Sequence, residues 1–208
     1  MALVERLKKG LGELAYTVKS YNGELDDDSI GTARLPLVLV AFGGSRIARM
    51  GTNARRHQSK ANFVVLVAVR SLRSEVSGRH GGITKNEIGA NQLISAVRRL
   101  LDAQSLGGLL ARPLLPVKVS TVFNSAKLSS GYLSAYSIEF EAVYDDYLPL
   151  EDGRFPEKTD DKNHPDYIFN NYNGQLSDPY PEFNVLGGSI ISPRNHAETS
   201  IEVKTYES

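Results

Sequence analysis

Residues 62–70 read Asn-Phe-Val-Val-Leu-Val-Ala-Val-Arg, and this stretch decides the fold of the chain. Seven apolar residues stand in a row between the asparagine and the arginine. A strand with one face in water would alternate apolar and polar residues, so the unbroken run indicates a strand that is covered on both faces. A buried helical segment is the alternative, but the short length and the four valines favour a strand. We expect this strand to lie at the centre of a sheet.

Three further segments have strand character. Residues 35–42 (Leu-Pro-Leu-Val-Leu-Val-Ala-Phe) form an apolar run in which Pro36 is tolerated near the strand start, because proline lacks an N–H group. Residues 117–124 alternate apolar and polar side chains, and so do residues 132–144, with a turn expected over residues 125–131. Alternation is typical of antiparallel strands with one face in water. The apolar face of the last strand is predicted to carry Tyr136, Ile138, Phe140, Ala142 and Tyr144.

Two segments have the periodicity of amphipathic helices. The first covers residues 3–18, although Gly10 and Gly12 each weaken it by roughly 1 kcal/mol relative to alanine. Its apolar stripe is Leu3, Leu7, Leu11, Leu14 and Val18. The second is predicted to begin at Thr84, because Thr84 and Glu87 match a capping box. Its apolar stripe is Ile88, Leu93, Val97, Leu100 and Leu101.

The order of these elements defines the expected fold class. Helix, strand, strand, helix, strand, strand predicts an α/β fold of the α+β type. We expect a single mixed or antiparallel four-stranded sheet with two helices packed on one face. This domain is predicted to cover residues 1–148.

From residue 149 to residue 208 the composition changes to proline, asparagine, aspartate and glycine, while aromatic residues remain frequent. A disordered tail is usually poorer in aromatic residues, so we predict an extended arm that becomes ordered against another surface. Its end, residues 200–206, alternates like a strand and is expected to add to an open sheet edge. The arm residues predicted to contact neighbouring subunits are Tyr167, Phe169, Tyr172, Tyr180, Phe183, Ile201 and Val203.

The charges of the 208-residue chain are balanced overall but unevenly distributed. Lysine and arginine number 24, as do aspartate and glutamate. Residues 43–80 nevertheless carry a net charge of +7, and residues 145–208 carry −8. Either these are solvated polar segments, or the asymmetry sets contacts between neighbouring copies. The chain has no cysteine, so disulfides play no part, and its first residues predict neither a signal peptide nor a membrane span.

The connection between the first two predicted strands, residues 43–60, is expected to be a protruding basic loop. A connection of this length without apolar periodicity is usually functional or mobile. Its basic side chains are predicted to contact a neighbouring subunit or to face a lumen; they are Arg46, Arg49, Arg55, Arg56 and Lys60. Phosphate binding by these side chains is the alternative, although the loop lacks aromatic residues for base stacking.

No constellation in the sequence predicts catalysis or a cofactor. The four histidines stand far apart in polar segments, without zinc-ligand spacing and without cysteine partners. The acidic run at residues 26–28 lacks the alternate spacing of a calcium loop. Glu139 and Glu141 share one strand face, but an exposed antiparallel face explains them equally well. We expect no enzymatic activity, no cofactor and no metal.

Several of these segments together resemble a known protein family. They are residues 35–42, residues 62–75 (Asn-Phe-Val-Val-Leu-Val-Ala-Val-Arg-Ser-Leu-Arg-Ser-Glu), residues 89–101 and residues 134–140. In order and pattern they resemble the tail terminator proteins of Mu-like contractile-tailed phages, whose architecture is similar to that of the lambda tail terminator. The resemblance covers about residues 1–148, and the arm beyond it departs from the short form of the family.

The resemblance implies a structural protein of the virion tail and neck, assembled in the host cytoplasm. It implies a ring, expected to be a hexamer, that caps the tail tube and sheath and provides the surface to which the head docks. The implied partners are further copies of the chain, tube and sheath proteins, and neck or connector proteins. Contact with DNA in the lumen would be incidental, and no membrane is involved. A nucleic-acid-binding module that uses residues 43–60, or another head–tail connector or neck protein, is the alternative.

Overall fold

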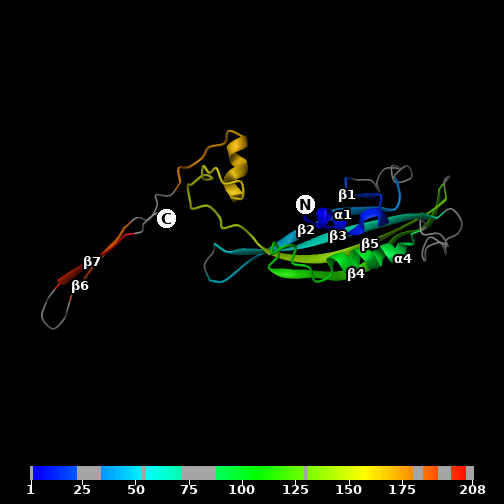
Figure 1. Ribbon diagram of the computed structural model, residues 1–208, viewed down its shortest axis with the longest axis horizontal. Coiled ribbons are helices and arrows are strands. Elements are labelled where there is room, and N and C mark those ends of the chain that lie inside the picture. Colours follow the sequence, from blue (N-terminus) through cyan, green and yellow to red (C-terminus); the bar gives the residue numbers. More distant parts are fainter. Residues whose placement is uncertain are drawn as a thin grey trace. The chain divides into compact units, whose positions relative to one another are not determined.

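A computed structural model describes residues 2–22, 34–52, 55–71, 88–128, 131–179, 185–191 and 198–204 (Figure 1). The chain divides into two compact units, Met1–Pro149 and Leu150–Ser208. We call the first unit the body. It contains the five-stranded sheet, the two described α-helices and every residue that the structure describes as buried.

The body is built on one mixed five-stranded sheet. The strand order is β1-β2-β3-β5-β4, and only the pairing of β1 with β2 is parallel. The α+β fold class is therefore confirmed, but the sheet has five strands instead of the four that we predicted. The strands are β1 (Thr17–Ser20), β2 (Leu37–Arg49), β3 (His57–Ser71), β4 (Arg112–Leu128) and β5 (Gly131–Asp145).

The predicted central strand is β3, which pairs with β2 on one side and with β5 on the other. Its alternate side chains enter two separate apolar clusters. Val65 and Val67 face the helices and belong to the main core. Ala68 lies on the opposite face in a smaller cluster with Leu37 and Leu133. A run without polar interruptions is what a strand with apolar cover on both faces requires.

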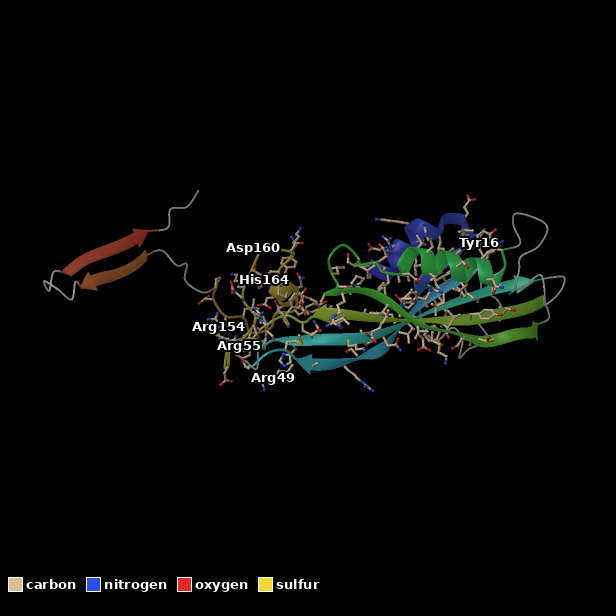
Figure 2. The ribbon with its side chains drawn as sticks, turned by 90° about the horizontal axis from the view of Figure 1, so that it is seen from below. Tyr16, Arg49, Arg55, Arg154, Asp160 and His164 are labelled. Carbon is tan, nitrogen blue, oxygen red and sulfur yellow. The ribbon has the colours of Figure 1, made fainter. Side chains whose placement is uncertain are left out.

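Helices α1 (Ala2–Leu11) and α4 (Ala90–Leu101) pack on the same face of the sheet, as predicted (Figure 2). Their buried stripes meet β3 and β5 in the main core. The two helices also contact each other. A methyl group added at Gly10 would come within 2.4 Å of the Leu100 side chain, so the glycine allows this close approach. The buried helical residues are Leu3, Val4, Leu7, Leu11, Ala90, Leu93, Val97 and Leu101.

The first helix is shorter than the predicted one, which was expected to reach Val18. It ends at Leu11 and is followed by the short 3₁₀ helix η1 (Gly12–Leu14), in which Gly12 has a φ of +51°. A positive φ breaks the α-helix at this point. Val18 is still buried, but in β1, the strand that the sequence analysis missed.

The predicted start of the second helix, at Thr84, does not match the start of α4. Thr84 and Glu87 lie outside the described residues, and α4 begins at Ala90 after Gly89 as its N-cap. The Gly89 N–H donates to Oε1 of Gln92 at 3.2 Å, so a glutamine three residues into the helix takes the capping role.

Strands β4 and β5 are both longer than the predicted segments, residues 117–124 and 132–144. The predicted faces of β5 are confirmed, because Ile138, Phe140 and Ala142 are all buried in the core under the helices. At the opposite edge from β1, β4 pairs with β5 alone among the described strands.

The second unit, Leu150–Ser208, has three described elements. They are the 3₁₀ helix η2 (Pro165–Asn171) and the antiparallel pair β6 (Val185–Ile191) and β7 (Glu198–Lys204). Residues 200–206 were expected to add to an open sheet edge. In the structure β7 is a strand, and its partner is β6.

Candidate functional site

Residues 43–60 form a β-hairpin, and the prediction of a loop was wrong. The β2–β3 ladder continues from Ser45 opposite Ala61 to Arg49 opposite His57, and it turns back between these ends. We call residues 43–60 the basic hairpin. The β2 side of it is exposed on both faces, so it shows neither an apolar run nor an apolar alternation. Main-chain pairing with β3 holds this segment in place, and that pairing leaves no pattern in the side chains.

A glycine bulge separates the basic hairpin from the rest of β2. The register of β2 against β3 shifts between Phe42 and Ser45, and Gly44 has a φ of +101°. Such a φ is sterically open to glycine and costly for other residues. Because β1 pairs with β2 only as far as Val40, no described strand covers the outer edge of β2 beyond that residue.

The basic hairpin has five basic residues and no acidic residue. Figure 2 shows Arg49 and Arg55 near its turn. Lys60 forms an ion pair with Glu141 at 2.7 Å, and the Arg49 guanidinium donates to the carbonyl oxygen of Thr52 at 3.0 Å. Neither Arg46 nor Arg56 forms an ion pair with a described residue. The predicted basic residues therefore lie together on one element and present a strongly positive surface.

The basic hairpin and the residue directly before it, Phe42, also expose large apolar side chains. These were not among the predicted site residues. Phe42 is 59% exposed, Ile47 is 67% exposed and Met50 is 42% exposed. Phe42 lies against Phe63 with 5.5 Å between ring centroids, so it is held in place while it faces water. The sequence signal was an isolated isoleucine inside a basic stretch, which is weak by itself. Exposed apolar groups beside charges are typical of interaction surfaces.

The chain leaving β5 is fastened to the base of the basic hairpin. The Ser59 hydroxyl, 2% exposed as a residue, lies 2.8 Å from both carboxylate oxygens of Asp146. The Asp146 N–H donates to the carbonyl oxygen of His57 at 3.0 Å, and the Arg55 guanidinium donates to that of Pro149 at 3.2 Å. A groove of about 530 Å³ lies at this junction, lined by Met50, Arg56, His57, Gln58, Asp145, Asp146 and Leu148.

Replacing Ser59 by alanine should lower the free energy of unfolding by about 1–3 kcal/mol. The partly buried Asp146 carboxylate would lose a hydroxyl donor, and hydrogen bonds to charged groups have this magnitude. Urea denaturation followed by circular dichroism measures the change. Ser45→Ala, at an exposed position of the same hairpin, is the matched control and should stay within about 0.5 kcal/mol of the parent chain. Equal stability of the two variants would contradict a structural role for the Ser59–Asp146 contact.

A second groove lies on the sheet face opposite the helices, and it is lined by both basic and acidic side chains. It has a volume of about 560 Å³ and is lined in part by Arg46, Lys60, Glu139 and Glu141. The Lys60–Glu141 ion pair crosses it. Among the described residues, no group of three histidine, aspartate or glutamate side chains is arranged to hold a metal ion.

The predicted contact residues of the C-terminal unit are only partly described. Tyr167 and Phe169 lie on η2, and Tyr172 follows directly as its C-cap. Tyr180 and Phe183 lie outside the described residues, while Ile201 and Val203 belong to β7.

His164 has a structural role at the start of η2. Its Nδ1 atom accepts a hydrogen bond from the Asp166 N–H at 3.2 Å, so the imidazole caps the 3₁₀ helix. The Asp166 carboxylate in turn accepts a hydrogen bond from the Glu157 N–H at 2.8 Å. The Nδ1 atom of His164 therefore already has a hydrogen-bond partner within the C-terminal unit.

Comparison with known proteins places the body in a phage family. No helix in the described part of the chain has the length and apolar character needed to span a membrane. No curated protein matches the chain. The family model described as "Bacteriophage Mu, Gp37" matches residues 1–145, a segment that ends at the last residue of β5. Because this match spans more than half of the sequence, the protein belongs to the bacteriophage Mu Gp37 family, with all five sheet strands inside the matched segment and the C-terminal unit outside it.

Proposed function

We propose that this phage protein is a tail terminator, a structural subunit of a ring that ends the tail tube and sheath and receives the head or neck. Membership of the Mu Gp37 family supports a phage role, and the resemblance to tail terminators of Mu-like phages supports the specific one. The observation that carries the proposal is the basic hairpin. It extends beyond the part of β2 that pairs with β1, so that no described strand covers the outer edge of β2 there. It also exposes apolar side chains and has no acidic residue.

A closed ring requires each subunit to present two different surfaces that meet between neighbours. The basic hairpin is one candidate surface. The outer side of β4 is another, because this long strand exposes Leu115, Val117 and Val119 and has no described partner beyond β5. Pro113 and Pro116 lie in β4 and lack N–H donors, which limits continuous pairing along this edge. The resemblance implies six copies, with tube, sheath and neck proteins above and below the ring.

Removing this gene product from the phage tests the proposal. Particles that lack a tail terminator should have tubes that grow past the normal length and should have no heads attached. Negative-stain microscopy of lysates gives both readouts, and the wild-type protein supplied in trans should restore both. A population with tails of normal length and with heads attached would contradict the proposal.

Nucleic-acid binding is the second candidate function, and it is favoured by the lack of described ion-pair partners for Arg46 and Arg56. If all five basic side chains of the hairpin neutralised phosphates, affinity for duplex DNA would fall roughly 500-fold between 50 and 200 mM salt. A filter-binding titration at these two salt concentrations separates the hypotheses. A steep loss of tight binding supports a DNA-binding module, whereas weak binding at both concentrations supports the structural role.

A further inference from the structure

Residues 150–179 form a folded segment without a core. None of these thirty residues is buried. The segment is closed by main-chain hydrogen bonds instead, since the Ser177 N–H donates to the carbonyl oxygen of Pro156 at 2.9 Å and the Lys158 N–H donates to that of Ser177 at 3.1 Å. The Arg154 guanidinium adds a contact of 2.7 Å to the carbonyl oxygen of Asp178. Hydrogen bonds fix the path of the chain, while its apolar side chains remain outside.

Three of the exposed apolar side chains, Ile168, Phe169 and Tyr172, lie on η2 or at its C-cap. Tyr172 is 75% exposed and Ile168 is 55% exposed, and Phe169 and Phe155 are also exposed. Isolated exposed apolar residues are common on protein surfaces, but several within one short element indicate an interface. Residues 150–179 also carry seven acidic and three basic residues, a net charge of −4. We call residues 150–179 the acidic module.

The basic hairpin has the complementary properties. It carries five basic residues and no acidic residue, and it exposes Ile47 and Met50, with Phe42 immediately before it. Charges of opposite sign steer two surfaces together, and the burial of aromatic and aliphatic side chains then supplies affinity. Both surfaces also fall in the segments with the largest charge asymmetry of the sequence.

We propose that the acidic module of one copy binds the basic hairpin of a neighbouring copy. Ile168, Phe169 and Tyr172 would cover the exposed apolar residues of the hairpin, and the acidic side chains would lie against its arginines. The contact is head-to-tail, because the two partners present different surfaces, and repeated contacts of this kind form a ring when the rotation between neighbouring copies closes. The inference rests on the proposed function in one respect only, namely that copies of the chain lie side by side.

Two full-length variants test this contact. The hairpin variant carries Arg46→Glu and Arg56→Glu, which reverse two exposed charges that have no described ion-pair partner. The module variant carries Ile168→Ser and Tyr172→Ser, at two exposed positions. Lys8→Glu with Lys9→Glu is the charge-matched control on α1, and Leu109→Ser is the control for an exposed apolar residue.

Sedimentation velocity measures the association state of each chain alone and of the two variants mixed. The wild-type chain and both controls should assemble, while each variant alone should associate roughly 30-fold more weakly. Mixed in equal amounts, the variants should form dimers and nothing larger. The hairpin variant keeps an intact acidic module, which can bind the intact basic hairpin of the module variant. The two surfaces left free in this dimer are the mutated ones, so no third copy can bind.

Three outcomes would overturn the inference. They are variants that assemble like the wild-type chain, a mixture that stays monomeric although the wild-type chain assembles, and a wild-type chain that remains monomeric at about 1 mM. A second measurement uses the absence of cysteine. An Ile47→Cys chain and a Phe169→Cys chain should be joined by a bifunctional maleimide, whereas Ile47→Cys mixed with Lys9→Cys should not; equal yields also contradict the contact.

This experiment is separate from the test of the proposed function. If the mixed variants form dimers but phage without the protein has normal tails, the contact is supported and the terminator role is rejected. Overlong tails without dimers would retain the terminator role and reject the contact.

Discussion

Truncating Phe140 to alanine is expected to lower the free energy of unfolding by about 3–5 kcal/mol. Phe140 is completely buried and is among the largest fully buried side chains. It lies on β5 opposite Phe63 of β3 on one side and Pro116 of β4 on the other, under the helices. Its removal leaves a cavity where both helices and three strands meet, and the neighbouring backbone cannot close it.

Thermal denaturation of the full chain should show the loss as a fall of about 6–20 °C in Tm. Leu109→Ala is the matched control, because Leu109 is 65% exposed and its truncation should change the unfolding free energy by no more than about 0.5 kcal/mol. If Phe140→Ala were as stable as this control, the core would not lie between the sheet and the two helices.

Ending the chain after Pro149 should leave a folded body that no longer assembles. No residue from 144 to 179 is buried, so the cut removes no buried residue from this part of the chain. The stability of the body should stay within about 1 kcal/mol of the full chain in urea denaturation. Association should be lost in sedimentation velocity, because the acidic module is removed while the basic hairpin remains.

A second truncation, after Tyr144, is the matched control for this cut. It also removes Asp145 and Asp146, which accept hydrogen bonds from Gln58 and Ser59 at 2.8 Å. We expect it to destabilise the base of the hairpin by about 2–4 kcal/mol, because the part-buried bond from Ser59 contributes about 1–3 kcal/mol and the exposed bond from Gln58 about 1 kcal/mol. A chain ended after Pro149 that fails to fold would show that the second unit completes the core of the first.

The parts of the fold with strong side-chain patterns were predictable from sequence. Residues 62–70 indicated the central strand because both of its faces are covered by apolar side chains, and that requirement excludes polar residues. The face of β5 that carries Ile138, Phe140 and Ala142 followed from alternation alone. The packing of both helices on one face followed from the order of the elements.

The parts held by the backbone were not predictable in the same way. β1 is four residues long, and its Val18 continued the spacing of the helix before it, so periodicity merged the two elements. The break between them depends on the φ of Gly12. The start of α4 depends on a glutamine side chain that accepts from the Gly89 N–H, a weaker signal than the capping box at Thr84.

The candidate site was predicted by residue type but not by shape. The five basic side chains were selected from charge, and the structure places them together on a hairpin in which β2 and β3 pair up to Arg49 and His57. Its apolar residues could not be distinguished in the sequence from ordinary surface positions, since exposure of single residues such as Ile47 depends on tertiary structure. The hydrogen bond from Ser59 to Asp146, which anchors the segment after β5, likewise leaves no pattern in the sequence.

A reconstruction of the mature phage particle tests the central claim most directly. We expect a hexameric ring of this chain at the junction of the tail tube and the neck, with the acidic module of each copy bound to the basic hairpin of the next. Density for the chain at any other position in the particle, or no density for it in the particle at all, would contradict the claim.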